Sequence, residues 1–111
     1  VRIKNFVVRK NSYGFLLYDL NSHKQVKTTF TKTAALAMAN QLIMDNNDTI
    51  KSILQVDDAI QSKYNECIFY KNTIARTEDD IKREVARTRY DIVWEDLLKL
   101  RDTLEDYIFD K

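Results

Sequence analysis

The chain has 111 residues, of which 18 are basic and 17 acidic, so it has the size of one domain and a formal net charge of only +1. One glycine, one cysteine and no proline exclude an internal disulfide, a cysteine-rich metal site and a glycine-rich phosphate loop. No apolar run approaches the ~18 residues that read as a membrane-spanning helix, so no membrane segment is expected.

Three strands are predicted in the first thirty residues. Residues 2–10 alternate between polar and apolar side chains, residues 13–20 form a nearly continuous apolar run, and residues 25–30 read as a third strand. Asn11-Ser12 and residues 21–24 separate these runs as turns. Such short connections predict a three-stranded antiparallel β-meander with one buried face.

Helical periodicity begins at Thr31. Thr31 or Thr33 is expected to be the N-cap of a helix that ends at the polar residues 45–48. Two further helices are expected over 49–72 and 77–109, and Thr77, followed by three carboxylates, is expected to cap the last one. One continuous helix through residues 72–77 is the alternative, because no glycine or proline forbids it.

The predicted fold class is therefore α+β. A three-stranded antiparallel β-meander packs on a helix and is followed by a long, coiled-coil-like antiparallel helical hairpin. Residues 1–45 form the basic meander with its helix, residues 46–111 form the acidic hairpin, and the two parts make one compact unit.

The last helix is too long for a spherical domain. About 30 residues at ~1.5 Å each span roughly 45 Å, whereas a compact chain of this length has a radius of gyration of ~13 Å. We therefore expect a hairpin whose remaining apolar surface supports a homo-oligomer. The candidate interface residues are Trp94, Leu97, Leu100, Leu104 and Ile108, although for Trp94 a core position is the alternative.

The apolar pattern of this helix has a phase slip. Ile81, Val85 and Ile92 repeat at helical spacing, and a second series begins at the adjacent Val93 and continues through Leu97. The pattern is interpreted as one heptad-like seam with a stutter.

Charge is divided unevenly along the chain. Residues 1–33 contain seven bases and one acid, a charge of +6, whereas residues 34–111 contain eleven bases and sixteen acids, a charge of −5. A basic head of this kind predicts an anionic partner, such as a nucleic acid, or contacts between subunits. The alternative is a solubilising sheet face whose lysines protect its edges. The candidate anion-binding residues are Arg2, Lys4, Arg9, Lys10, Lys24 and Lys27.

Residues suited to catalysis are scarce. His23 is the only histidine and lies in a predicted turn, and Cys67 lies on an apolar helix stripe. One histidine and one cysteine cannot form a catalytic triad or a zinc site within one chain. We therefore predict no enzymatic activity, no catalytic or metal-binding residues and no cofactor.

The N-terminal part resembles the ethylene-response-type DNA-binding domain of plants. The shared pattern is Tyr13-Gly14-Phe15, Asp19, and Phe30 followed by residues 32–35. The resemblance covers about 35 residues and implies a three-stranded sheet that binds DNA. This chain lacks most of the arginine and tryptophan base-readers of that family, because the segment has only Arg2 and Arg9 as arginines.

Most of the chain also resembles small uncharacterised proteins of tailed phages that infect marine cyanobacteria. The resemblance lies in the runs 3–43 and 69–92 and in the richness in asparagine, lysine and isoleucine. It implies an oligomeric accessory or virion protein, located in the host cytoplasm or the virion, with other phage structural proteins as partners. The predicted function is thus a non-enzymatic structural or interaction protein, and the alternative is nucleic-acid binding by the basic meander.

Overall fold

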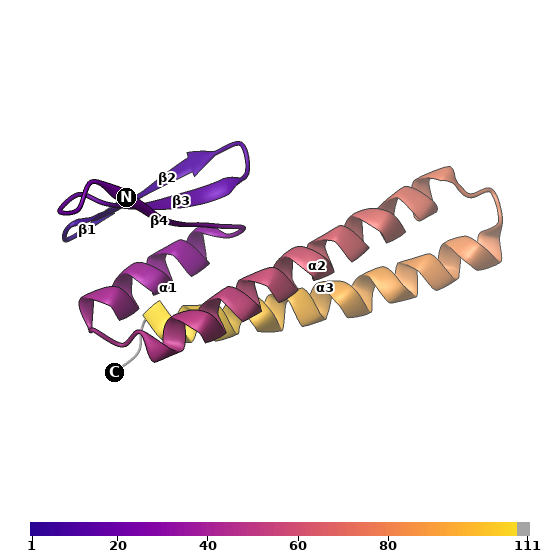
Figure 1. Cartoon of the computed structure of the whole chain (residues 1–111). Helices are drawn as coiled ribbons and strands as arrows, with labels where there is room; N and C mark the ends of the chain where they lie inside the picture. Colours follow the sequence, from indigo (N-terminus) through magenta and orange to yellow (C-terminus); the bar gives the residue numbers. More distant parts are fainter. Residues whose placement is uncertain (109–111) are drawn as a thin grey trace.

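A single helix, α1 (Lys32–Ile43), separates a small β-sheet from a long helical hairpin (Figure 1). The computed structural model describes residues 1–108. The strands are β1 (Arg2–Ile3), β2 (Phe6–Asn11), β3 (Gly14–Asp19) and β4 (Lys24–Thr29), and the hairpin consists of α2 (Asp48–Arg76) and α3 (Asp80–Ile108). This arrangement confirms the α+β fold class with an N-terminal antiparallel sheet and two long helices that pack together.

The sheet has four antiparallel strands in the order β1-β2-β3-β4, one more than predicted. The predicted strand over residues 2–10 is interrupted at Lys4, which has a φ of 51°, so that Ile3 lies opposite Phe6. Asn5 stabilises this reversal, because its carbonyl accepts from the Leu20 N–H at 2.8 Å. Polar residues suit an exposed strand position and a tight turn equally well, so the alternation did not reveal the reversal.

Gly14 begins β3 with a φ of 145°, a conformation that other residues rarely adopt. A Cβ atom at this position would clash with the Thr29 carbonyl oxygen on β4. The only glycine of the chain therefore allows β3 and β4 to approach closely where β3 begins.

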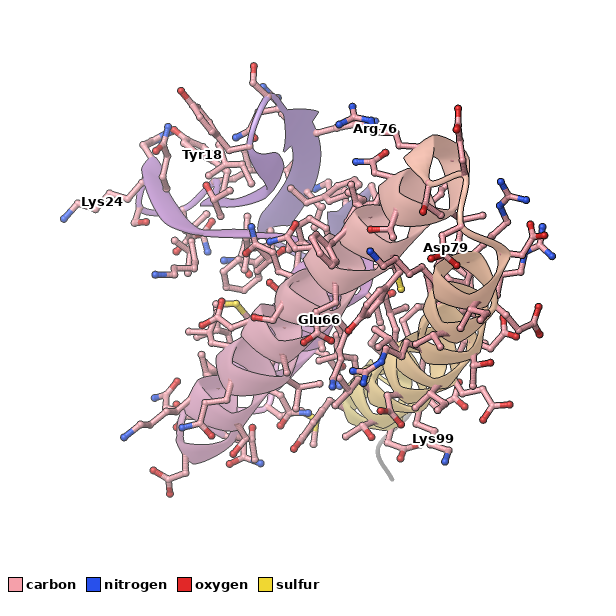
Figure 2. The ribbon with its side chains drawn as sticks, turned by 90° about the vertical axis from the view of Figure 1, so that its right-hand side faces the viewer. Tyr18, Lys24, Glu66, Arg76, Asp79 and Lys99 are labelled. Carbon is pink, nitrogen blue, oxygen red and sulfur yellow. The ribbon has the colours of Figure 1, made fainter. Side chains whose placement is uncertain are left out.

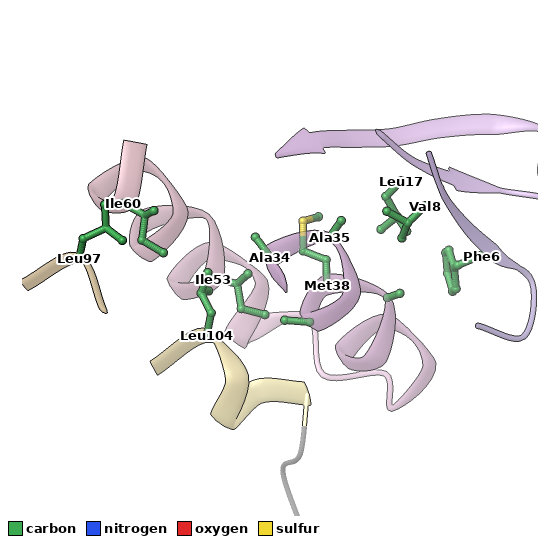
Figure 3. Close-up of a cluster of buried hydrophobic side chains, with 12 residues drawn as sticks. Phe6, Val8, Leu17, Ala34, Ala35, Met38, Ile53, Ile60, Leu97 and Leu104 are labelled. Carbon is green, nitrogen blue, oxygen red and sulfur yellow. The ribbon is translucent and has the colours of Figure 1, made fainter. Parts of the chain in front are cut away.

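The hydrophobic core runs through all three layers (Figure 3). Four alanines of α1 are fully buried, and these small side chains allow the sheet and the hairpin to approach opposite sides of α1. Because one cluster joins the sheet to both hairpin helices, residues 1–45 and the described part of 46–111 share a core. The side chains labelled in Figure 3 are Phe6, Val8, Leu17, Ala34, Ala35, Met38, Ile53, Ile60, Leu97 and Leu104.

Polar contacts cap α1 at its N-terminus and bind its C-terminal end to the hairpin. At the N-terminus, Thr31 is the N-cap, which confirms one of the two predicted positions, and its hydroxyl accepts from the Ala34 N–H at 3.1 Å. At the C-terminal end, the side-chain amides of Asn40 and Gln41 donate to the Tyr107 carbonyl at 3.0 and 2.9 Å. That carbonyl lies in the last described turn of α3.

The hairpin is confirmed, and the alternative of one continuous helix is wrong. The chain leaves helical structure only at residues 77–79, so α2 extends four residues beyond its predicted end. The cap differs from the prediction as well: the Asp79 carboxylate, rather than Thr77, accepts from the N–H groups of Ile81 and Lys82. The predicted end of α3 at residue 109 lies outside the described residues.

The hairpin makes the molecule elongated, with extents of 57 × 30 × 19 Å and a radius of gyration of 17.1 Å. A compact chain of this length has a value of ~13 Å. The excess comes from the half of the hairpin that extends beyond the sheet and α1, here called the distal half (residues 62–96) (Figure 1).

Candidate interaction surfaces

Most of the predicted oligomer interface belongs to the core of the single chain. Leu97 and Leu104 are 5% and 0% exposed, and Leu100 and Ile108 are partly buried against the same cluster. The assignment of these four residues to an intermolecular surface is therefore corrected: α1 and α2 cover them. Trp94 alone of the five is exposed, at 39%.

Three of the candidate anion-binding lysines lie on the side of the sheet that faces α1. Residues directly opposite each other on neighbouring strands share a face. Lys10 lies opposite Phe15, and Lys27 lies opposite the fully buried Leu17. Lys24 lies opposite Asp19, on the same side. All three lysines are nevertheless exposed.

The two arginines occupy the opposite, open face of the sheet. Arg2 lies opposite Val7, and Arg9 lies opposite Leu16. Tyr18 shares this face (Figure 2) and is half-buried among these strands. Lys4 is the exposed residue of the β1–β2 turn. The register therefore divides the six bases between two faces and a turn, and no single face brings them all together.

Asp19 is the only acid of the basic head, and it stabilises two turns. It accepts from the Asn5 side-chain amide at 2.8 Å and from the Asn21 N–H at 2.9 Å. The hydrogen bond from Asn5 is the main reason why the pKa of Asp19 lies below its ordinary value.

The two residues most suited to catalysis lie in different parts of the molecule. His23 is exposed in the β3–β4 turn, with a φ of 57°. Cys67 is buried in the hairpin, and burial raises the pKa of its thiol, which disfavours the nucleophilic thiolate. In residues 1–108, no group of three potential metal ligands comes together. No helix in that range is long and apolar enough to cross a membrane.

The distal half of the hairpin carries most of the exposed apolar surface. Seven of the twelve large apolar side chains exposed in the described chain lie in this half, and an eighth, Leu98, lies just beyond it. The side chains buried between the two helices there are small: Cys67, Ala86 and Val93. Two helices alone leave much of their apolar surface in water, because each can bury only the stripe that faces the other. The exposed residues are Tyr64, Ile68, Phe69, Ile81, Val85, Ile92, Trp94 and Leu98.

One groove, the distal groove, lies between α2 and α3 near the hairpin turn and has a volume of about 430 Å³. The rings of Phe69 and Tyr70 pack edge to face at 5.4 Å on the α2 side. Its remaining lining residues are Thr73, Ile81, Lys82, Val85, Ala86 and Arg89. A neighbouring hollow shares Tyr70 and Arg89 and reaches Ile92, so the apolar surface is continuous along α3.

A second groove, the α1-side groove, occupies the other flank of α3 and has a volume of about 240 Å³. The rings of Tyr90 and Trp94 stack at 6.3 Å on α3, and Tyr64 of α2 contacts Phe30 at 5.5 Å just before α1. Its other lining residues are Cys67, Ile68 and Lys71.

The phase slip between Ile92 and Val93 was the signal in the sequence that the apolar residues of α3 fall into an exposed and a buried group. Val93 begins the series that faces the core, whereas Ile81, Val85 and Ile92 are 76%, 49% and 57% exposed. The single predicted seam is therefore two stripes on different sides of α3. The slip separates the residues of the solvent-facing stripe from those of the buried stripe, to which Ala86 also belongs.

Comparisons of the chain with protein-family models, with curated proteins and with solved structures find no match.

Proposed function

We propose that this protein is a non-enzymatic structural or interaction protein that associates with further copies of itself through the distal half of its hairpin. The observation that carries the proposal is the exposed stripe of Ile81, Val85 and Ile92 beside Phe69, all at least 49% exposed. Contiguous apolar surface of this kind marks interaction sites on soluble proteins. The location is favourable, because no other element of the described chain covers the distal half (Figure 1).

Light scattering coupled to gel filtration tests the proposal over a range of protein concentrations. The wild-type chain should associate at micromolar concentration, and the variant Phe69→Ser/Ile81→Ser/Val85→Ser should be monomeric with an unchanged helical spectrum. Tyr13→Ser is the matched control, because Tyr13 is 87% exposed on the β2–β3 turn and is not part of the hairpin. A wild-type monomer at every concentration would refute self-association.

The phage context of this proposal is carried by the sequence resemblance described above. In that context the protein is an accessory or virion component that contacts other phage structural proteins. Mass spectrometry of purified virions is the direct measurement, and consistent absence of the chain would refute a place in the virion.

The open sheet face favours a second candidate function, nucleic-acid binding. Arg2, Arg9 and Tyr18 share a face of the sheet that no helix covers. Such a complex should weaken steeply with salt, because phosphate contacts release counterions. A mobility-shift assay at low salt compares the wild type with Arg2→Glu/Arg9→Glu, and Lys10→Glu/Lys27→Glu serves as the control from the α1 side. If neither DNA nor RNA shifts, this candidate fails.

A further inference from the structure

We infer that α3 of one copy pairs with α3 of a second copy in parallel orientation along residues 81–92. This inference rests on the proposed self-association and adds the partner element, the direction and the register. The contact stripe consists of residues 81, 85, 88 and 92, which repeat with the 4-3-4 spacing of a two-helix seam. Thr88, the one polar member, is exposed like its three apolar neighbours.

Charges of opposite sign flank this stripe. Lys82 and Arg89 lie on the side of α2, where they line the distal groove. Glu84 and Asp91 lie on the other side, since successive residues of a helix turn by about 100°. All four are exposed, and within residues 1–108 none of them has an ion-pair partner.

The distribution of these charges selects the direction of the second helix. In a parallel pair of helices, the residue that directly precedes a core position, such as Glu84 before Val85, lies opposite a residue of the partner helix. That residue is five positions further along the sequence. Glu84 of each copy then faces Arg89 of the other, which gives two favourable pairs by symmetry. In an antiparallel pair, equivalent flanks meet, so bases would face bases and acids would face acids.

The same rule limits the length of the contact. The next parallel pair would place Asp91 opposite Asp96 of the second copy, and Asp96 is bound at 3.9 Å by Lys63 of its own chain. Glu95 and Lys99 occupy the next two stripe positions and are exposed. The helices therefore separate after Ile92. A seam of two heptads is small for a protein interface, so we expect a dissociation constant in the micromolar range.

Disulfide trapping tests the direction in a Cys67→Ser background. In a parallel pair, identical core positions of the two helices face each other closely enough to form a disulfide. Ile81→Cys alone and Ile92→Cys alone should therefore each give covalent dimers under mild oxidation. Asp102→Cys, on the same helix but outside the contact, should remain monomeric. If only the mixture of Ile81→Cys and Ile92→Cys chains were trapped, the pair would be antiparallel and the inference wrong.

A charge exchange tests the register without introducing cysteines. Glu84→Arg places a second arginine opposite Arg89 of the other copy, and symmetry repeats this unfavourable pair once. The dissociation constant should therefore rise by about tenfold. Glu84→Arg/Arg89→Glu restores opposite charges and should bring the constant back to within about threefold of wild type. Asp102→Arg makes the same change of charge outside the contact and should have no effect.

The two levels of the proposal fail in distinguishable ways. A wild-type monomer at all concentrations overturns both the self-association and the parallel pairing. An oligomer that is lost in the serine variant, yet gives neither single-cysteine dimers nor rescue by the charge exchange, overturns the parallel pairing alone.

Discussion

The carboxylate of Asp57 accepts two hydrogen bonds from Thr31, one from its N–H at 3.0 Å and one from its hydroxyl at 2.7 Å. The other carboxylate oxygen accepts from the Phe30 N–H at 2.7 Å. Asp57 lies on α2 and is only 3% exposed, so a residue of the hairpin binds the first N–H groups before α1. This contact fixes the position of the sheet and α1 on the hairpin.

Asp57→Ala should lower the free energy of unfolding by about 2–4 kcal/mol, because it leaves the N–H groups of Phe30 and Thr31 without their acceptor. Urea denaturation followed by circular dichroism measures the loss. Asp58→Ala is the matched control, since Asp58 is the exposed neighbour and should change stability by less than about 0.5 kcal/mol. Equal losses in the two variants would contradict this role of Asp57.

Gly14→Ala should destabilise the protein by about 2–3 kcal/mol, because alanine at a φ of 145° is strained and its Cβ would meet the Thr29 carbonyl. The measurement is the thermal midpoint, and the amide exchange of β3 and β4 should increase more than that of α3. Ser12→Ala, in the exposed turn, is the control. Wild-type stability in Gly14→Ala would mean that β4 is not held at this distance.

The acid titration of Asp19 should lie below that of an ordinary aspartate, and Asn5→Ala should move it upward, because Asn5 is the main cause of the shift. Since the folded state has the lower pKa, the stabilisation by this carboxylate is present above the ordinary aspartate pKa. It disappears as the pH falls through the folded value. NMR titration of the side-chain carboxyl carbon measures both midpoints. An unchanged midpoint in Asn5→Ala would contradict the assignment.

Cys67 should react with a thiol reagent at pH 8 at least about tenfold more slowly in the folded protein than in urea, because burial both shields the sulfur and raises the thiol pKa. The raised pKa favours the neutral thiol in the folded state. Its contribution to stability is therefore present below the ordinary thiol pKa and is lost as the pH rises above it. Equal rates in the two states would show that the hairpin opens readily around Cys67.

The candidate surface of the sheet and that of the hairpin were predictable from the sequence to different extents. The bases of the head were identified as residues, but their distribution over two faces follows from the Lys4–Asn5 reversal and the strand register. The apolar residues of α3 were identified as a pattern, but the phase slip at residues 92 and 93 was interpreted as a stutter in one seam, whereas the structure has two stripes. Which stripe faces solvent depends on the side of α3 against which α2 and α1 pack.

The sequence by itself determined the local structure of this protein. Alternation in the first thirty residues and helical spacing after Thr31 predicted an antiparallel meander of three strands, although the sheet has four, followed by three helices. They also predicted Thr31 as one of two candidate caps, and the hairpin, because these features depend on neighbouring residues. Tertiary structure alone decided that α1 lies between the sheet and the hairpin, which buries Leu97, Leu104 and Asp57 and leaves Ile81, Val85 and Ile92 exposed. Burial depends on which distant surfaces meet, and a periodic pattern records only that a stripe is apolar.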